Sequence, residues 1–186
     1  QFILSEAILK NHTLKSNKYI SQDARGKKKG HMHIKYLENY PRIISAQPDP
    51  RKDNRRKINS SLLKNTVDPV IGIFNIGLNG SCNKREIVFD GKRKYALKIK
   101  FLQKEKIVKN IFYTNEFDVI KCVFDIEKLE GYTKKEINKF PNNGYIWFKK
   151  AKNDFYFPAK IQISTNWGTF LCLIKEKEFT YESNSM

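Results

Sequence analysis

The stretch IVFDGKRKYALKIKF, residues 87–101, decides the fold class of this chain. In its second half an apolar side chain falls on every other residue, which is the pattern of a strand with one buried face. Before it, the run 87–89 leads into Asp90-Gly91. An Asp-Gly pair between two strand-like runs is typical of a tight hairpin, because glycine accepts a positive φ without steric cost. The buried face of the second strand should be Tyr95, Leu97, Ile99 and Phe101.

The same alternation recurs on both sides of this hairpin. Apolar residues occupy both faces of 145–149 and 169–175, which favours central or covered positions for these two segments. A turn at Asn166-Trp167-Gly168 should precede the last strand. We expect further strands over residues 2–9, 32–37, 42–46, 55–59, 120–126, 145–149, 157–164 and 169–175.

Two segments are expected to be helical. In 68–77, Asp68 can cap the free amide groups and Pro69 suits the first helical turn. A shorter helix should span 133–140. Strands separated by turn signals predict a sandwich or barrel. The sequence therefore predicts an all-β, mainly antiparallel fold, either a strongly curved sheet or an open barrel with one or two short helices, in a single domain over residues 1–186.

The chain is strongly basic, with 36 Lys and Arg against 19 Asp and Glu and a net charge of +17. Nucleic acid is disfavoured as a partner, because 29 of the 36 are Lys, whereas planar recognition of phosphate favours Arg. The high content of Lys, Asn, Ile, Phe and Tyr is what AT-rich codons supply, so base composition explains the positive charge without selection for a polyanionic partner. Segment 47–57 should be an exposed loop. Its basic residues are a candidate surface for anions: Arg51, Lys52, Arg55, Arg56 and Lys57.

Catalytic and metal-binding signatures are weak. His31 and His33 would share a strand face, but no third ligand is evident, so exposed strand histidines are the favoured interpretation. Asp68 and Asp90 have capping and turn roles that account for them. Arg93 belongs either to an anion site or, more commonly, to cross-strand charge pairing. We therefore expect no enzyme, no cofactor and no metal.

The aromatic content is high, with 13 Phe, 9 Tyr and 2 Trp. Most of these residues should be core. A curved sheet that does not close would leave some of them lining a cleft, which is the usual setting for an apolar ligand. The strand-rich half contains Phe89, Tyr95, Phe101, Phe124, Trp147, Phe148, Phe155, Tyr156, Phe157, Trp167 and Phe170.

Four segments, taken in their order along the chain, resemble one family. They are VDPVIGIF (67–74), the 87–101 stretch, VIKCVFDIEKLEGY (119–132) and FYFPAKIQIST (155–165). The family is domain-of-unknown-function family 3108, uncharacterised exported proteins of Gram-negative bacteria. The resemblance implies a periplasmic location, with a signal peptide and first strands that we expect ahead of residue 1. It also implies similarity to the open barrels of periplasmic lipoprotein carriers, where a helix plugs the concave side. The residues that carry the family motifs are Asp68, Pro69, Phe89, Asp90, Gly91, Arg93, Tyr95, Gly131, Tyr132, Pro158 and Gly168.

The three cysteines are interpreted through the same resemblance. Cys82 and Cys122 fall where the family tends to place two cysteines, which implies a disulfide in an oxidising periplasm. Two buried thiols, or metal or redox chemistry, are the alternatives. Cys172 is expected to be a small buried hydrophobic residue.

Two functions remain open. The first is a periplasmic binding or carrier-like domain with an apolar groove, on the concave face of the sheet, for a lipid or other amphiphile. The second is a structural or interaction module of the cell envelope, whose basic loop 47–57 contacts anionic lipid, anionic polymer or an envelope protein. A hydrolase is a distant third, which a buried pair of carboxylates in a cleft would support.

Overall fold

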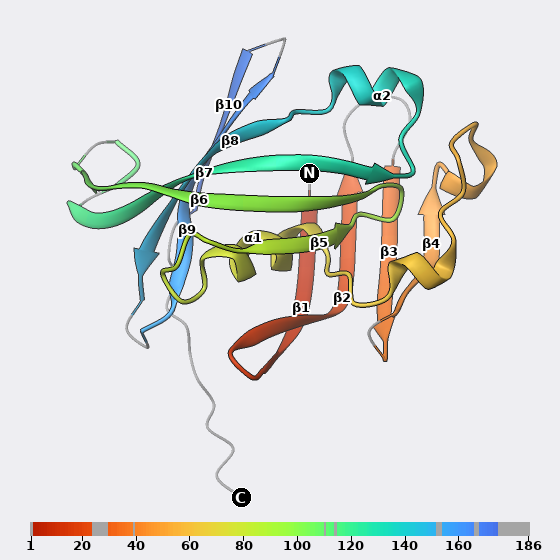
Figure 1. Cartoon of the computed structure of the whole chain (residues 1–186), viewed down its shortest axis with the longest axis horizontal. Helices are drawn as coiled ribbons and strands as arrows, with labels where there is room; N and C mark the ends of the chain where they lie inside the picture. The colour runs from red at the N-terminus through yellow and green to blue at the C-terminus, as the bar shows by residue number, and fades with distance from the viewer. Residues whose placement is uncertain are drawn as a thin grey trace, which may run out of the picture.

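The computed structural model describes residues 2–23, 30–38, 40–109, 111–113, 115–151, 154–165 and 168–174. These residues form two antiparallel sheets and two short α-helices, which confirms the predicted fold class (Figure 1). The sheets do not close into a barrel. Within the described ranges no helix is long and apolar enough to cross a membrane.

Within each sheet the strands follow the order of the chain, so each strand pairs with its sequence neighbours in that sheet. The N-terminal sheet contains β1 (Phe2–Lys10), β2 (Thr13–Asp23), β3 (Gly30–Leu37) and β4 (Tyr40–Gln47). The second sheet contains β5 (Arg85–Phe89), β6 (Lys94–Ile107), β7 (Phe117–Glu130), β8 (Asn143–Lys150), β9 (Tyr156–Thr165) and β10 (Gly168–Leu173). The remaining elements are the 3-10 turns η1 (Pro50–Lys52) and η2 (Ser60–Leu63) and the helices α1 (Pro69–Gly77) and α2 (Lys134–Lys139).

Helix α1 packs against strands of both sheets and joins them. Asp68 caps its first turn by accepting hydrogen bonds from the amides of residues 70 and 71. The same carboxylate accepts hydrogen bonds from the hydroxyls of Ser5 (2.9 Å) and Ser16 (2.6 Å) on the N-terminal sheet. Further along the helix, the Asn75 amide exchanges two hydrogen bonds with the backbone of Leu14. The helix is therefore tied to β1 and β2 by polar groups and to the second sheet by apolar contacts.

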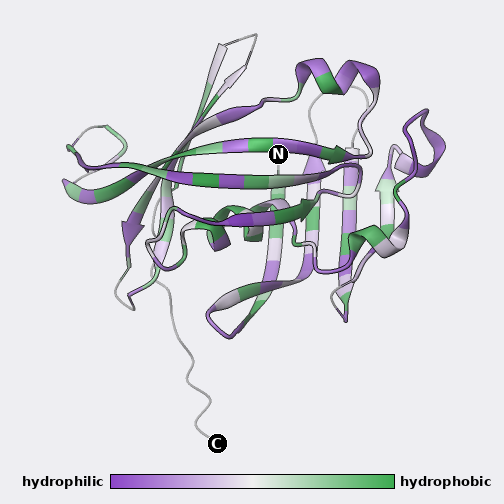
Figure 2. Ribbon diagram, in the orientation of Figure 1, coloured by the Kyte–Doolittle hydropathy of each residue, from purple (hydrophilic) through white to green (hydrophobic). Residues whose placement is uncertain are grey.

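The core consists of two clusters of buried apolar residues. The larger one lies around α1 and the second sheet and includes Ile76, Ile146 and Phe148. The smaller one lies between the N-terminal sheet and the β5–β6 hairpin and includes Ile34 and Phe89. Figure 2 shows apolar residues along α1, where the larger cluster forms. The Cys82–Cys122 disulfide is present, with the two Cα atoms 6.2 Å apart, as the resemblance implied.

Several sequence-based expectations need correction. Segment 55–59 is not a strand, and β2 was not expected. Strand β10 is an edge strand rather than a central or covered one. Cys172 is therefore exposed and free, not buried. Phe101 is 55% exposed, because β6 has a register irregularity there that ends the simple alternation. Of the turn expected at 166–168, residues 166 and 167 lie outside the described part of the chain.

Candidate functional site

A surface pocket of about 180 Å³ lies where the loop after β4 meets the turn between β5 and β6. Its apolar lining comes from β4, the loop, η2 and β5, and Pro50, Leu63 and Phe89 are its buried apolar members. Its basic lining comes from the loop and the turn. The lining residues are Ile43, Pro50, Arg51, Arg55, Arg56, Lys57, Ile58, Leu63, Phe89, Gly91 and Lys92.

The loop is shaped by two aspartates, each followed two residues later by an arginine. The carboxylate of Asp49 accepts hydrogen bonds from the backbone amide of Arg51 at 2.9 Å and from its guanidinium, also at 2.9 Å. Asp53 does the same for Arg55, at 3.1 Å and 2.6 Å. Such carboxylates stabilise turns by capping nearby amides. The hydrogen bonds from Arg51 hold the pKa of Asp49 down at about 2.

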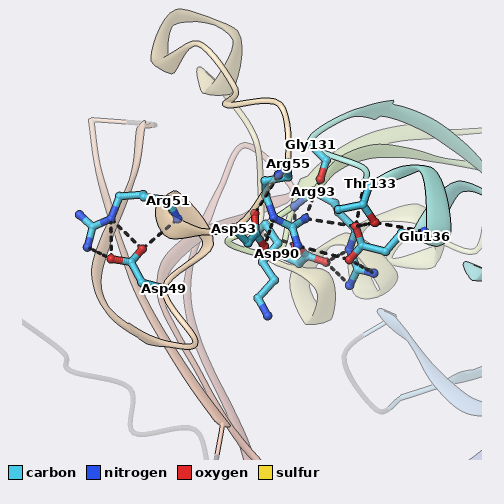
Figure 3. Close-up of polar contacts among 10 residues, drawn as sticks. Asp49, Arg51, Asp53, Arg55, Asp90, Arg93, Gly131, Thr133 and Glu136 are labelled. Atoms are coloured by element: carbon cyan, nitrogen blue, oxygen red, sulfur yellow. Dashed lines mark hydrogen bonds and ion pairs between the residues drawn. The ribbon is translucent and has the colours of Figure 1, made fainter.

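Arg55 anchors this loop to the rest of the molecule (Figure 3). Its side chain is only 8% exposed. Its guanidinium donates a hydrogen bond to the backbone carbonyl of Gly131 at 2.6 Å and pairs with the carboxylate of Glu136 at 3.3 Å. A planar guanidinium can satisfy several acceptors at once, which an ammonium group cannot do in the same geometry. Arg55 is therefore a structural residue of the pocket wall, not a free cation.

Glu136 is held in place by the N-terminus of α2. Thr133 and Glu136 form a capping box, in which each side chain accepts a hydrogen bond from the backbone amide of the other. Partial burial works to raise the pKa of Glu136, but the hydrogen bonds from Thr133 and the charges of Arg55 and Arg93 outweigh it and lower that pKa. Glu136 is thus an ionised carboxylate shared by two arginines.

The hairpin turn between β5 and β6 spans four residues, two more than the minimum for an Asp-Gly hairpin. Asp90 closes it by accepting hydrogen bonds from the amides of Lys92 (2.9 Å) and Arg93 (2.7 Å). The Arg93 guanidinium pairs with Asp90 at 2.7 Å and lies 4.3 Å from the ring centre of Phe140. Arg93 is therefore used by this ion pair and this ring, rather than in an open anion site.

Two glycines allow the turns to approach one another. Gly91 has φ +91°, and a Cβ on it would lie 2.4 Å from the sulfur of Met32. Gly131 has φ +77°, and a Cβ on it would lie 2.3 Å from the carbonyl oxygen of Lys92. Both conformations favour glycine, and both positions lack space for a side chain. The close approach places the β5–β6 turn against the segment that follows β7.

The structure thus brings some family-motif residues together and leaves others apart. Asp90, Gly91, Arg93 and Gly131 lie in one network beside the pocket, and Tyr132 lies 6.0 Å from Arg93. Tyr95 is buried against Phe140 beneath this network. The other motif residues lie elsewhere: Asp68 and Pro69 at the start of α1, Pro158 buried in β9, and Gly168 at the start of β10.

The basic residues that line the pocket are not equivalent. Arg51 and Arg55 are paired with aspartates. Arg56, Lys57 and Lys92 have no carboxylate partner among the described residues. None of the described residues that line the pocket is acidic. Lys52 is exposed in the same loop but does not line the pocket. The pocket therefore combines an apolar lining with three unpaired positive charges.

Sequence reasoning named the basic loop residues, Phe89 and Gly91, but missed the other residues that line the pocket. Lys92 was not singled out, although it follows Asp90-Gly91 directly, and that adjacency was the available signal. Ile43, Ile58 and Leu63 come from three separate segments, and no sequence pattern links them. Glu136 also carried no signal beyond its place three residues after Thr133.

The concave face, where we expected an apolar groove, is filled by α1 and the larger cluster. Five residues of the aromatic set are at most 5% exposed: Phe89, Phe124, Trp147, Phe148 and Phe157. Phe101 and Phe170 are exposed on the surface, and Trp167 lies outside the described residues. The aromatic residues therefore build the core in the part of the chain that the structure describes.

The remaining candidate residues do not assemble a second site. His31 is exposed, but His33 is partly buried, with its Nε2 atom enclosed and without a hydrogen-bond partner, which corrects the expectation that both are exposed. No group of three potential metal ligands occurs among the described residues. Burial raises the pKa of Asp68, although four hydrogen bonds from hydroxyls and amides oppose the effect.

The comparisons with known proteins agree with the resemblance seen in the sequence. Neither a curated protein nor a solved structure matches the chain. One family model, described as a protein of unknown function (DUF3108), matches residues 2–174. This chain therefore belongs to the DUF3108 family.

Proposed function

We propose that this is a non-catalytic binding domain of an exported protein, and that it binds an anionic amphiphile in the pocket beside loop 47–57. The observation that carries the proposal is the combination of an apolar lining with three cations that, among the described residues, have no carboxylate partner and no acidic neighbour in the lining. In this arrangement the anionic group contacts Arg56, Lys57 and Lys92, and the apolar group packs on Leu63 and Phe89. The carboxylate or phosphate of the ligand replaces the missing acidic partners.

The size of the pocket limits the ligand. Its volume is about 180 Å³. An apolar cavity of about 150 Å³ holds benzene, whereas pockets for drug-sized ligands have volumes of about 300–1,000 Å³. The pocket is therefore suited to a ring or the end of an alkyl chain rather than a whole lipid. This favours recognition of an anionic head with its first apolar segment over enclosure and transport of a lipid.

Export is supported by the disulfide. Cys82 is 4% exposed and Cys122 is not exposed at all, and the bond between them closes a loop of 40 residues. Disulfides persist in oxidising compartments such as the periplasm and are rare in the reducing cytosol. The disulfide therefore supports a proposed location in the periplasm of a Gram-negative cell, where anionic amphiphiles are components of the envelope.

The test is a titration with three probes that separate charge from apolarity. Octyl phosphate carries both features, inorganic phosphate only the charge, and octyl glucoside only the chain. We expect calorimetric titration to show the tightest binding for octyl phosphate. The triple variant Arg56→Ala, Lys57→Ala and Lys92→Ala should weaken that binding at least about tenfold, which corresponds to about 1.4 kcal/mol.

A matched control separates the pocket from general electrostatics. Lys10, Lys35 and Lys100 are exposed, lie outside the pocket, and have no carboxylate partner in the described part of the chain. Replacing these three by alanine removes the same charge and should leave binding within about twofold, because distant surface charges are screened. Equal weakening by the two triple variants, or no binding of octyl phosphate to the wild type, would overturn the proposal.

A further inference from the structure

The β6–β7 hairpin ends in exposed apolar side chains at the opposite end of the molecule from loop 47–57 (Figure 1). Ile111 is 90% exposed, Val108 63% and Phe112 49%. Figure 2 shows the apolar character of this tip. Folded monomers expose single apolar residues freely, but a protruding group of them marks an interaction site.

The tip projects because its neighbours stop short of it. Strand β5 pairs with β6 only as far as Lys98, and β8 pairs with β7 only from Val119 onward. Strands β6 and β7 pair with each other out to Ile107 and Phe117. Val108, Ile111 and Phe112 therefore lie beyond the last paired residues of β6 and β7.

The loop at the tip is fastened to the sheet. The hydroxyl of Tyr113 donates a hydrogen bond to the backbone carbonyl of Ala159 at 2.6 Å. Its ring also meets the ring of Phe117 edge-on, with 5.1 Å between the centres. These contacts bend the loop toward β9 and leave Ile111 outside. The contacts of Tyr113 thus fix the part of the loop in which Ile111 is exposed.

Lysines surround the apolar tip. Lys104 and Lys109 are exposed and have no carboxylate partner among the described residues, and Lys106 is paired with Glu116 at 3.3 Å. Glu105, the acidic residue of β6, is already occupied by Lys121 and by the indole N–H of Trp147, and Asp118 of β7 lies opposite Lys106. Long lysine side chains can place their stems along an apolar surface and their charges at an anionic one.

We propose that the tip of the β6–β7 hairpin binds the surface of an anionic lipid bilayer, with Val108, Ile111 and Phe112 entering the boundary between headgroups and acyl chains. A convex apolar tip with a basic collar matches a planar lipid interface, whereas a protein partner would have to supply a groove. Apolar burial and attraction to anionic headgroups act together at such an interface. This site lies on other residues than the proposed pocket and does not depend on it.

Vesicle binding of the whole chain tests the proposal. The probe is vesicles of phosphatidylcholine with about one-quarter phosphatidylglycerol, compared with phosphatidylcholine alone. We expect the double variant Val108→Asp with Ile111→Asp to lower the partition coefficient at least about tenfold. Two apolar side chains that would insert into the bilayer are then replaced by negative charges that the headgroups repel. The control is Leu62→Asp with Ile137→Asp, two residues 45% and 49% exposed elsewhere on the surface, which should change it by less than about threefold.

Two further measurements separate insertion from simple attraction of a basic protein. In Phe112→Trp the tryptophan should be quenched by lipids brominated in the acyl chain, whereas Leu62→Trp should show only the background quenching of the wild type. Raising the salt from about 0.05 to 0.5 M should weaken binding without abolishing it. Equal binding of the tip and control variants, or equal quenching of the two tryptophans, would refute insertion at the tip. The pocket triple variant should still insert.

Discussion

Replacing Arg55 by alanine should release loop 47–57 from the segment that follows β7. The side chain is 8% exposed, and its removal leaves the Gly131 carbonyl without its 2.6 Å donor. Of its two arginine partners, Glu136 would keep only Arg93, at 3.8 Å, beside its hydrogen bonds from Thr133. Hydrogen bonds to charged groups contribute about 1.5–3 kcal/mol, and removing one partner of a fully buried pair costs about 3–5 kcal/mol. Because Glu136 is 26% exposed, we expect a cost below that of a fully buried pair, about 2–3 kcal/mol.

Thermal unfolding measures this change directly. For a chain of this size about 2–4 °C is lost per kcal/mol, so Tm should fall by about 4–12 °C. Arg51→Ala is the control, because Arg51 is 64% exposed and pairs only with Asp49 in the same loop. Arg55→Lys should fall between the two, since it retains the charge but not the planar fork. The reasoning fails if Arg55→Ala and Arg51→Ala have the same Tm, or if Arg55→Lys equals the wild type.

Three further outcomes are expected. Removing the disulfide with Cys82→Ala and Cys122→Ala should lower stability by about 4 kcal/mol, from the chain entropy of a 40-residue loop; calorimetry with and without reductant checks it, and a wild-type Tm unchanged after full reduction would contradict it. Gly131→Ala should cost about 2–4 kcal/mol, because it adds backbone strain and a clash with the hairpin turn. Gly30→Ala, whose new Cβ would lie 3.4 Å from its nearest neighbour, should be much milder, and urea titration of both variants measures the difference. Glu136 has a lowered pKa, so its stabilising effect is present above the unfolded value of 4.5 and lost as the pH falls below it. The difference in unfolding free energy between wild type and Glu136→Gln should therefore shrink between about pH 6 and pH 3, and parallel stability curves would count against the assignment.

Local patterns predicted those parts of the fold that rest on local physics. The hairpin at Asp90-Gly91 and the cap of α1 at Asp68 form as expected, because each depends on residues close in sequence. Strand β2 was missed since its inward-facing Ser16 binds the buried Asp68 carboxylate. A polar residue on the inner face interrupts the alternation that signals a strand.

The candidate site was predictable only in part for the same reason. Loop 47–57 was recognised as exposed and basic, but its residues have different roles that depend on distant partners. Arg55 meets Glu136, 81 residues away, whereas Arg56 meets no described carboxylate. Which cations remain unpaired depends on how the loop packs against η2 and the β5–β6 turn. That packing is set by the tertiary fold and not by the local sequence.

The sequential order of the strands in both sheets governs how the chain folds. Pairing between neighbours closes only short loops, so each sheet can form rapidly from local contacts. Docking of the two sheets depends on α1, through Asp68 and Asn75, and should be the late step. If the chain emerges into the folding compartment from its N-terminus, the first four strands are complete before α1 follows, and their inner face, including Met32 and Ile34, stays uncovered. That interval is when the chain is most prone to aggregation, and a chaperone that shields residues 30–47 would act there.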